Sequence, residues 1–262
     1  MTDYQTITLE RDGPLATITL NRPDLRNAFN ETAIAELSVA FQLLGDDSAI
    51  RVVILAAQGP AFCAGADLNW MKKMAGYSRE QNLADAAQLA AMLRAIALCP
   101  KPVIARVQGD VYAGGVGLVA AADIAVVADT AHFCLSETRI GLIPATISPY
   151  VIRAMGMSAA RRYFLTAERF TAERAKECGL AHEVVPAAEL EQTVNAIVQA
   201  LLAASPQAVA AAKQLVRDVG GRAIDEALVA DTVERIADIR ASSDGREGIQ
   251  SFLDKRKARW QA

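Results

Sequence analysis

A glycine-rich turn holds the residues best suited to chemistry in this sequence. Gly114, Gly115 and Gly117 lie between a β-branched run, Val103–Val107, and an apolar segment that ends at Asp123. Glycine lets a backbone approach a ligand closely, and a helix that begins here offers unpaired N–H groups. Together with the helix dipole, those N–H groups can hold an anion, or an oxygen that becomes negatively charged during a reaction.

A second turn of the same kind lies earlier in the chain. It runs from Gly59 to Leu68, after a buried strand expected over Val52–Ala56, and it also leads into a helical pattern. Two N–H groups that converge on one point are what an oxyanion hole needs. The two turns together therefore predict a site that stabilises negative charge on an oxygen.

The glycine-rich turn also fits a dinucleotide-binding fingerprint, with Gly115, Gly117 and Ala120 at the fingerprint positions and Glu137 further along. In a dinucleotide-binding unit the strand runs directly into the first glycine, whereas residues 108–114 separate Val107 from Gly115 in this chain. No clear βαβ unit closes behind the motif. The context therefore disfavours a dinucleotide site.

The elements that must position these turns follow from periodicity and capping residues. Alternation predicts a hairpin of strands Thr6–Leu9 and Ala16–Leu20. Further strands are expected over Val52–Ala56, Val103–Val107, Ile124–Ala128, His132–Phe133 and Leu180–Val185. Helices are expected from Asn30 towards Leu44, from Ser78 to about Leu98, over Ala172–Cys178, and as three helices from Ala187 onward, separated near Ser205 and Gly220. Strands alternate with helices early in the chain and helices dominate late, which indicates an α/β fold with a helical C-terminal region.

Composition narrows the class of protein. The chain has 262 residues, is 52% hydrophobic and 22% charged, and carries a net charge of −3. That balance suits one large domain and gives no basic surface for nucleic acid or an anionic membrane. The 4 cysteines are far apart and there are only 2 histidines, so metal and disulfide sites are not expected. Without a visible signal peptide or a membrane-spanning segment, a cytoplasmic protein with free cysteines is expected.

A series of motifs runs along nearly the whole chain. In order, the motifs are Asn21-Arg-Pro with Asn27-Ala-Phe29, Ala61-Phe-Cys-Ala-Gly-Ala-Asp-Leu68, Lys101-Pro-Val-Ile-Ala, Gln108-Gly-x-x-x-Ala-Gly-Gly, Ala122-Asp-Ile124, Phe133-x-x-Ser-Glu137, Gly141-Leu-Ile-Pro144 and Phe252-Leu-Asp-Lys-Arg256. No single motif is decisive. Taken together, in this order and at this spacing, they resemble the enoyl-CoA hydratase/isomerase (crotonase) superfamily.

The resemblance implies an α/β architecture, a crotonase-like spiral of ββα turns with a helical C-terminal region that builds trimers, often paired into hexamers. It implies a spiral core over residues 1–196, which binds CoA and the acyl group, and a C-terminal helical region over residues 197–262. The implied partner is an acyl-CoA thioester. Because coenzyme A is then part of the substrate, neither a separate cofactor nor a metal is expected.

Catalytic roles also follow from the resemblance. The N–H groups of Ala66 and Gly114 would hold the thioester oxygen as it becomes an enolate. Glu137 would hold water near the β-carbon and manage the proton, a general acid–base task typically worth about 10²–10⁴-fold. The alternative for Glu137 is a surface glutamate or a helix cap.

The residues expected by the same resemblance to bind substrate are Leu25, Arg26, Ala28, Ala64, Asp67, Leu68, Trp70, Met71, Tyr112, Gly117, Arg139 and Lys255. Ala64 and Ala66 would lie beside the adenine, and Leu25 and Arg26 would border the CoA chain. Lys255, with Arg256 after it, would reach the CoA phosphates. A solvated helix face is the alternative for this basic pair.

One departure from the family pattern concerns the second acid–base group. Hydratases of the family usually carry a second glutamate where this chain has Gly117. Three explanations stay open. Glu137 does both proton transfers in turn, or another group replaces the missing carboxylate, with Asp110, Tyr112 and Asp67 the nearest candidates, or the reaction needs only one base.

Hydration is the favoured reaction. Bacterial 3-methylglutaconyl-CoA hydratases of leucine breakdown, and related hydratases of acyclic terpene breakdown, resemble this chain in Ala66-Asp-Leu-x-Trp-Met71, Phe133-Cys-Leu-Ser-Glu137 and Arg139-Ile-Gly-Leu-x-Pro-Ala-x-Ile-Ser-Pro149. The main alternative is a Δ3,Δ2-enoyl-CoA isomerase that uses a single glutamate. Hydrolysis of a β-branched acyl-CoA is a weaker alternative. The hypothesis outside the class of enzymes is a non-catalytic crotonase-like binding protein.

The acyl end of such a substrate needs its own contacts. Trp70, Met71 and Met74 fall on helical spacing, and the resemblance places this region beside the acyl chain. Packing in the core is the alternative for them and for Tyr112. A glutaconyl group carries a distal carboxylate, for which Arg139 is the first candidate partner. Other candidates are Lys72, Lys73, Thr146 and Ser148.

Overall fold

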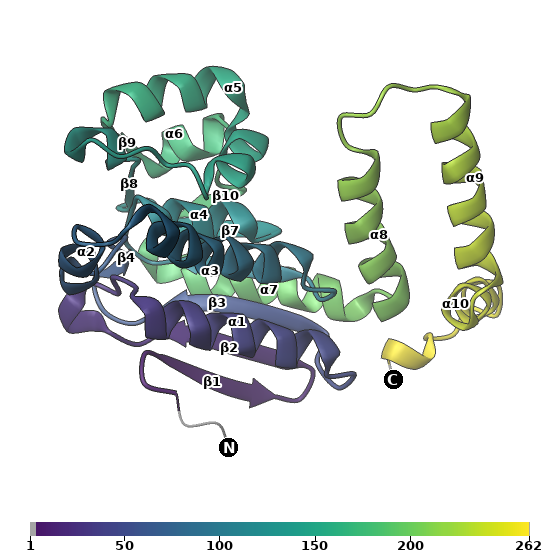
Figure 1. The fold of residues 1–262 in the computed structure, drawn as a ribbon. Helices are drawn as coiled ribbons and strands as arrows, with labels where there is room; N and C mark the ends of the chain where they lie inside the picture. The colour runs from purple at the N-terminus through teal and green to yellow at the C-terminus, as the bar shows by residue number, and fades with distance from the viewer. Residues whose placement is uncertain (1–3, 262) are drawn as a thin grey trace.

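The computed structural model describes residues 4–261, and it contains two β-sheets surrounded by helices (Figure 1). The larger sheet has six strands in the order β1-β2-β3-β5-β7-β10. Neighbouring strands are parallel except in the β1–β2 hairpin. Its strands are β1 Ile7–Asp12, β2 Leu15–Leu20, β3 Val52–Ala57, β5 Val103–Val107, β7 Ile124–Ala128 and β10 Glu183–Val185.

The smaller sheet has four strands in the order β4-β6-β8-β9. Each of them is three residues long: β4 Ala61–Cys63, β6 Asp110–Tyr112, β8 His132–Cys134 and β9 Arg169–Thr171. The first three are parallel to one another, and β9 is antiparallel to β8. Short strands such as these carry little periodicity, because pairing with distant residues defines them rather than any local pattern.

Helices connect and cover the two sheets. They are α1 Glu31–Asp46, α2 Leu68–Met74, α3 Arg79–Leu98, α4 Gly114–Ala121, α5 Ser148–Thr166, α6 Ala172–Glu177, α7 Leu190–Ala203, α8 Pro206–Val219, α9 Glu226–Ala241 and α10 Ser243–Leu253. Repeatedly, a strand of the larger sheet leads to a strand of the smaller sheet and then to a helix, as in β3-β4-α2 and β5-β6-α4. The third repeat, β7-β8, leads to a 3-10 turn, Glu137–Ile140, and then to α5. The predicted ββα spiral with a helical C-terminal region is confirmed.

The central strands of the larger sheet are buried on both faces. In β3, Val53 and Leu55 belong to the main core, whereas Val52 and Ile54 on the other face pack with residues of α7. Every residue of β3 is buried. A strand covered on both faces has no polar side, which explains why β3 is a continuous apolar run in the sequence.

Local capping explains why several helices begin where the sequence predicts. The Asn30 side chain accepts a hydrogen bond from the Ala33 N–H at the start of α1. Ser78 and Gln81 form a reciprocal capping box before α3. Thr171 caps α6 through the Arg174 N–H. Each cap satisfies an N–H that a helix leaves unpaired.

The structure corrects two expectations about the second half of the chain. The segment after Gly221 forms two helices, α9 and α10, so four helices follow Ala187 instead of three. The break comes at Ser242, whose side chain accepts from the Gly245 N–H and starts α10. The strand expected over Leu180–Val185 is only Glu183–Val185, because the Leu180 and Ala181 N–H groups bond back to α6. Residues 196 and 197, on either side of the predicted boundary, lie within α7; the division into two regions stays a prediction.

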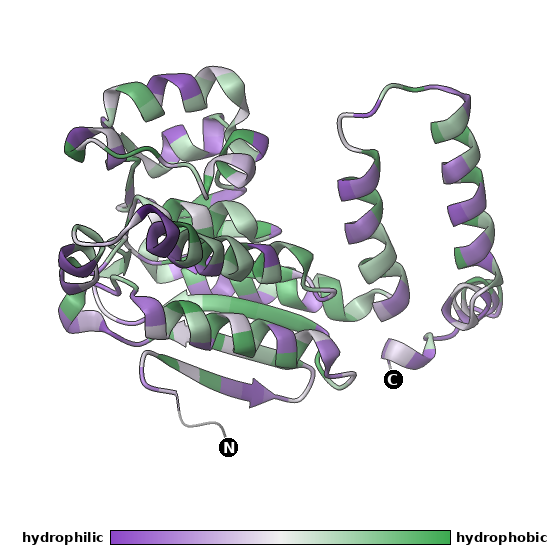
Figure 2. Ribbon diagram, in the orientation of Figure 1, coloured by the Kyte–Doolittle hydropathy of each residue, from purple (hydrophilic) through white to green (hydrophobic). Residues whose placement is uncertain are grey.

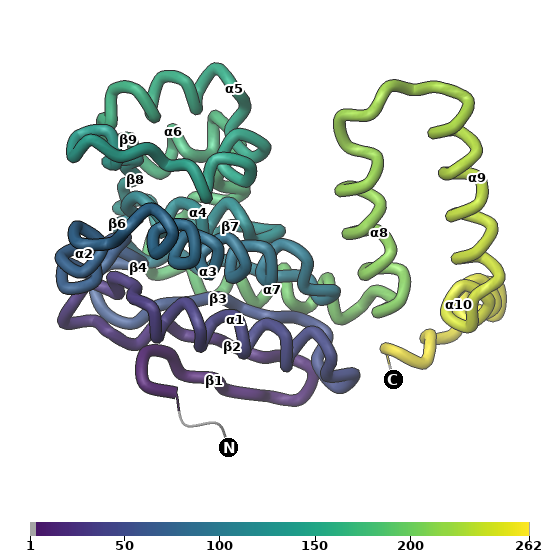
Figure 3. Tube along the Cα trace, in the orientation of Figure 1, coloured from purple at the N-terminus to yellow at the C-terminus, as the bar shows by residue number. Residues whose placement is uncertain are grey.

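Helices α8 and α9 form an arm that extends away from the two sheets (Figures 1 and 3). Polar and apolar residues alternate along both helices (Figure 2). The exposed apolar side chains of this arm are Leu215, Val216, Ile224, Val229, Val233 and Ile236. Within residues 4–261 no single helix is long and apolar enough to cross a membrane; only α7 with its preceding turn, taken together with α8 at a bend of 108°, passes that test.

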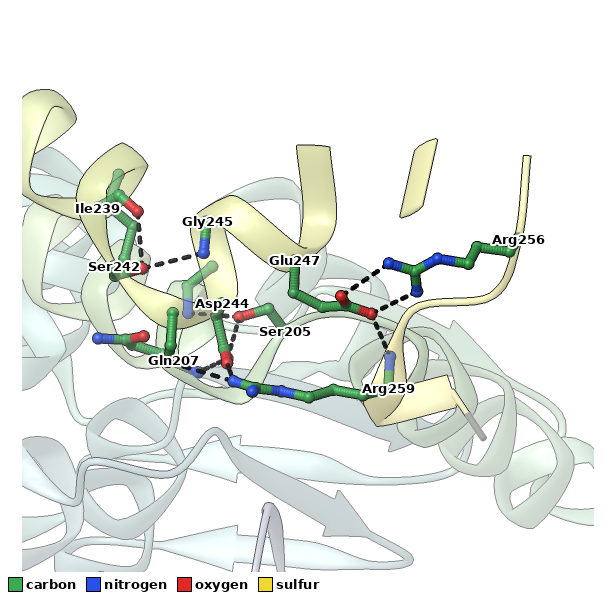
Figure 4. Close-up of polar contacts among 11 residues, drawn as sticks. Ser205, Gln207, Ile239, Ser242, Asp244, Gly245, Glu247, Arg256 and Arg259 are labelled. Atoms are coloured by element: carbon green, nitrogen blue, oxygen red, sulfur yellow. Dashed lines mark hydrogen bonds and ion pairs between the residues drawn. The ribbon is translucent and has the colours of Figure 1, made fainter. Parts of the chain in front are cut away.

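A polar cluster around Asp244 fixes the base of the arm (Figure 4). The buried Asp244 carboxylate accepts a hydrogen bond from the Ser205 hydroxyl at 2.7 Å and pairs with Arg259. Ser205 caps α8, so Asp244 joins the start of α8 to α10 and to the C-terminal segment. Burial alone would raise the pKa of Asp244, but the bonds from Ser205 and Arg259 hold it below its ordinary value. Arg51, at the start of β3, donates to the Ala204 and Trp260 carbonyl oxygens and ties this cluster to the sheet.

We expect Asp244→Asn to lower the free energy of unfolding by about 1–3 kcal/mol, as the loss of a hydrogen-bonded charge typically does. Because the folded-state pKa of Asp244 is depressed, its stabilisation is present above the pKa of the unfolded chain and is lost as the pH falls through the folded pKa. Urea unfolding of both proteins at neutral and acidic pH measures this. Asp238→Asn, at an exposed α9 carboxylate, is the matched control and should change little; equal losses in the two variants would contradict the role of the cluster.

Candidate active site

Three parallel strands bring the predicted catalytic groups to one edge of the smaller sheet. Strands β4, β6 and β8 are neighbours, with Cys63 paired to Val111 and Tyr112 paired to Cys134. Parallel strands have their carboxyl ends on the same side, where ligands of α/β folds usually bind. The chain that leaves these three ends carries Ala66, Gly114 and Glu137 respectively.

The first turn presents the Ala66 N–H to this edge. Residues on both sides of Ala66 are bonded to Phe29: the Phe29 N–H donates to the Gly65 carbonyl oxygen at 2.9 Å, and the Asp67 N–H donates to the Phe29 carbonyl oxygen at 3.0 Å. In this pattern the Ala66 N–H points away from Phe29. It donates to no other group among residues 4–261, so it is free to bind a ligand oxygen.

The second turn presents the Gly114 N–H. Ala113 has φ 47° and ψ −120°, a conformation that an L-residue seldom adopts. Its own N–H donates to the Cys134 carbonyl oxygen at 2.8 Å. Gly114 then begins α4, and its N–H makes no hydrogen bond within the described part of the chain. The positive end of the helix dipole reinforces this second free donor.

The two turns are in contact, and the contact requires glycine. A Cβ at Gly65, where φ is 90°, would lie 3.1 Å from the Ala113 Cβ. A Cβ at Gly115 would lie 2.8 Å from the Cys63 Cβ. Glycines in both turns therefore let the two strand ends approach closely enough for their free N–H groups to face one region.

Glu137 begins the 3-10 turn after β8 and is half-buried. Its Oε2 atom is buried and has no hydrogen-bond partner among the described residues. Burial raises the pKa of Glu137 above its ordinary value, although a bond from its own backbone N–H opposes that rise. A desolvated carboxyl group with a free oxygen is suited to taking up and releasing a proton.

Two other carboxylates that the sequence offered for the second acid–base role are already paired. Asp67 forms an ion pair with Arg22 at 2.7 Å and caps α2 through the Asn69 N–H. Burial alone would raise the pKa of Asp67, but these partners hold it below its ordinary value. Asp110 accepts from the His132 N–H at 3.0 Å and pairs with Arg169 at 3.3 Å. Neither carboxylate has the free oxygen that Glu137 has.

Gly117 lies inside α4 and is buried. A Cβ at this position would come within 2.2 Å of the Cγ2 atom of Ile147 and 3.5 Å of a Leu93 methyl group. An apolar side chain thus fills the space beside Gly117, where the family pattern would place a second glutamate. Among the described residues, no group of His, Cys, Asp and Glu side chains is arranged to hold a metal ion.

Eight of the ten remaining predicted residues are placed by their elements and their contacts. Ala28 and Ala64 lie in the two segments that pair beside the first turn, since the Ala64 N–H bonds to the Arg26 carbonyl oxygen at 2.9 Å. Leu25 and Leu68 are 49% and 73% exposed beside that turn. Of the others, Arg26 follows Leu25, Met71 lies in α2 after the first turn, Tyr112 ends β6 and Arg139 lies in the 3-10 turn after β8.

Two predicted residues lie differently. Trp70 is 3% exposed, donates from its indole to Asp85 at 3.0 Å and packs with Phe29 at 6.0 Å between ring centroids, so its ring is mainly core. Lys255 is exposed in the segment after α10, and Figure 1 places that segment near the arm, away from α2 and β4. Within one chain, therefore, Lys255 does not join the other residues.

Sequence reasoning missed Phe29, Arg22 and Ala113, which shape the two turns. Phe29 and Arg22 stand within the quoted motifs, but their roles depend on contacts with residues far along the chain. Ala113 is an ordinary residue type in an unusual conformation. In the sequence, only the glycines that follow Ala113 indicate an unusual backbone conformation in this turn.

Comparisons with known proteins agree with this architecture. The chain matches the family described as Enoyl-CoA hydratase/isomerase over residues 10–262. An enoyl-CoA hydratase structure from Shewanella pealeana is 42% identical, with a TM-score of 0.95 over 98% of this chain and 96% of that one. An enoyl-CoA hydratase structure from Mycobacterium smegmatis is 36% identical, with a TM-score of 0.92 over 98% and 100% of the two chains.

Similarity at the level of sequence extends to the short-chain-enoyl-CoA hydratase of Clostridium acetobutylicum, which is 29% identical over 261 residues, 97% of each chain. These matches cover nearly the full length, including the spiral, both glycine turns and the helical C-terminal region. The chain belongs to the enoyl-CoA hydratase/isomerase family and has the crotonase fold.

Proposed function

We propose that this protein is an enzyme that adds water across the α,β double bond of an enoyl-CoA thioester. The observation that carries the proposal is the placement of two unpaired N–H groups, of Ala66 and Gly114, at the same strand edge as the free carboxyl oxygen of Glu137. The names of the similar proteins support the same reaction.

The chemistry follows from these three groups. The two N–H groups donate hydrogen bonds to the thioester carbonyl oxygen and stabilise the negative charge that it gains. Glu137 removes a proton from water while the water oxygen bonds to the β-carbon, and the double-bond electrons move to give the enolate. Glu137 then returns that proton to the α-carbon, so that one water is consumed and the thioester carbonyl re-forms.

Coenzyme A is part of this substrate, and no other cofactor enters the proposal. The backbone near Ala64 and Ala66, with Leu25 and Arg26 opposite, offers the exposed surface on which the CoA chain would lie. We place the acyl chain on the other side of the two N–H groups, towards Met71 and Tyr112.

For the acyl group, we propose 3-methylglutaconyl or a related branched glutaconyl chain of leucine or isoprenoid degradation. Such a chain ends in a carboxylate, which needs a cation. Arg139 is exposed two positions after Glu137 and forms no ion pair within residues 4–261. Two of the other candidates are less free, because Lys73 pairs with Glu31 at 3.0 Å and the Ser148 hydroxyl donates to the Ala145 carbonyl oxygen at 2.8 Å.

A Δ3,Δ2-enoyl-CoA isomerase is the second candidate, and one observation favours it. Glu137 is the one carboxylate with a free buried oxygen among the described candidates, and isomerisation needs a single base that moves a proton from one carbon to another. Hydration by one carboxylate also needs two proton transfers, the first from water and the second to the α-carbon. A product analysis separates the two reactions, because isomerisation leaves the mass of the thioester unchanged.

Assembly into trimers or hexamers is also part of the proposal. The arm exposes apolar residues of α8 and α9, and Val216 and Ile224 are 76% and 90% exposed. Exposed apolar surface of this kind marks an interaction site. A second copy of the chain would cover it, and neither nucleic acid nor a membrane is an expected partner. A cytoplasmic location stays a prediction.

The first test follows the ultraviolet absorbance of the conjugated thioester when the purified protein meets 3-methylglutaconyl-CoA. Absorbance should fall quickly, and Glu137→Gln should slow the loss by about 10²–10⁴-fold. Because the base must be ionised, kcat/KM should fall as the pH drops through the raised pKa of Glu137, above the ordinary 4.5. Glu10→Gln, at an exposed strand residue, is the control. Undiminished activity in Glu137→Gln would overturn the proposed role.

Arg139→Ala tests the proposed acyl group. Loss of a cation that binds the distal carboxylate should lower kcat/KM for 3-methylglutaconyl-CoA by about 10- to 100-fold, which corresponds to a charge-assisted hydrogen bond. Activity with crotonyl-CoA, which has no distal carboxylate, should change little. Equal losses on the two substrates would exclude Arg139 as the partner of that carboxylate.

Gly117→Ala tests whether Ile147 excludes a side chain at the position of the second glutamate. The added methyl group meets Ile147 at 2.2 Å, so the variant should lose about 1–3 kcal/mol of stability through overpacking. The double variant with Ile147→Ala should be more stable than the sum of the two single losses predicts, because the shortened side chain leaves room for the added methyl group. Thermal unfolding of the four proteins in this cycle gives the coupling, and strict additivity would show that the two side chains do not compete for one space.

A further inference from the structure

Phe29 lies between the two turns of the candidate active site. It follows Arg26 and Asn27, which both have positive φ, and precedes the cap of α1. Asn27 anchors this segment, since its amide donates to the Gln58 and Ala61 carbonyl oxygens at 2.7 and 2.9 Å. Phe29 itself is 2% exposed, so its position is fixed from several sides.

The backbone of Phe29 determines the direction of the first N–H donor. Phe29 and Ala66 form an isolated parallel bridge. The Phe29 N–H and carbonyl groups bond to Gly65 and Asp67, the two neighbours of Ala66. In a bridge of this kind the residue between the two bonds directs its own N–H to the opposite side. The free Ala66 N–H therefore depends on Phe29 for its orientation.

The ring of Phe29 supports the second N–H donor. A Cβ built on Gly114 would lie 2.4 Å from the Phe29 Cζ atom and 3.0 Å from Cε1. The edge of the ring is thus in contact with the backbone at Gly114, the first residue of α4. On its other side the ring packs against Trp70. Gly114 cannot move towards the core while the ring is in place.

One residue thus contacts both donors, through its backbone for Ala66 and through its ring for Gly114. We propose that Phe29 is a positioning residue that sets the separation and direction of the two N–H groups, an inference that rests on the proposed function. Such donors act when they lie about 2.7–3.1 Å from the oxygen as it becomes negative. A smaller side chain at residue 29 leaves room for the start of α4 to shift, and the backbone bridge alone does not hold Gly114.

Phe29→Leu is the test, with Phe41→Leu as the matched control. Phe41 is 1% exposed in the core on α1, so the control removes the same ring atoms from the same core without touching either turn. Two properties are measured: kcat and KM with crotonyl-CoA, and the ¹³C resonance of bound butyryl-CoA labelled at the thioester carbon. Butyryl-CoA has no double bond to hydrate, and hydrogen bonds to its carbonyl oxygen shift that resonance downfield.

In Phe29→Leu, kcat should fall by about 10- to 100-fold, somewhat less than after removal of an entire oxyanion donor. KM should change by less than about threefold, and the downfield shift should shrink. Phe41→Leu should lose comparable stability while it keeps the wild-type kcat and carbonyl shift. If Phe29→Leu does not fold, Phe29→Met, which keeps most of the volume, gives the same comparison.

The outcomes separate this inference from the proposed function. A wild-type kcat and carbonyl shift in Phe29→Leu, or equal losses in both leucine variants, would overturn the positioning role and leave hydration standing. A wild-type protein that shifts the carbonyl resonance but hydrates no enoyl-CoA would overturn the proposed reaction, while loss of that shift in Phe29→Leu would still support the positioning role. A wild-type protein that hydrates enoyl-CoA without a carbonyl shift would overturn the positioning role alone, and one that shows neither activity nor shift would overturn both.

Discussion

The parallel pairing of β4, β6 and β8 is the interaction on which the candidate active site depends. Each of these strands has only three residues, and each follows a longer strand of the larger sheet. The larger sheet sets the spacing of β3, β5 and β7, and the short strands carry that spacing to a second sheet. Their carboxyl ends then meet at one edge, so three separate ββα turns deliver Ala66, Gly114 and Glu137 to one region.

The close approach of the two turns at that edge requires a strained backbone conformation at Ala113. Ala113 has φ 47° without the freedom of glycine, and a conformation of this kind typically costs about 1–3 kcal/mol. Its N–H bond to Cys134 of β8 holds it there. The Phe29 ring packs against the backbone at Gly114, and the Phe29 backbone bonds to both neighbours of Ala66. Both free N–H groups are therefore held by neighbours whose own hydrogen bonds are complete, and this pre-organises them for a ligand oxygen.

Features with a local cause could be predicted from the sequence, and those with a non-local cause could not. Asn30 and Ser78 start helices because their side chains bond within the next turn, and β3 is recognisable as a continuous apolar run. In contrast, β4 and β6 exist only through their partners. The two glycine-rich turns could be recognised from their glycines. The role of Phe29, in contrast, arises from contact with residues that are distant in the chain.

The same distinction applies to the candidate catalytic groups. The resemblance to the family selected Glu137, yet neither its burial nor its free oxygen could be seen in the sequence. Gly117 stood out as a missing glutamate, but only the structure shows that Ile147 fills its place. The break at Ser242 was missed because the nearest glycine, Gly245, lies inside the first turn of α10 and no proline stands beside it. Lys255 matched a motif at the end of the chain, and the fold of one chain carries it away from the others.

A single carboxylate that carries out both proton transfers needs surroundings that adjust its pKa. A group that first takes a proton from water and then gives it to carbon must be effective as a base and as an acid, and this is favoured when its pKa lies near the working pH. A second carboxylate nearby would change that pKa by charge repulsion, whereas the apolar contact between Ile147 and Gly117 adds no charge. Desolvation is the main cause of the raised pKa of Glu137. In this chain, therefore, burial is what raises the pKa of the one carboxyl group that the proposed reaction uses.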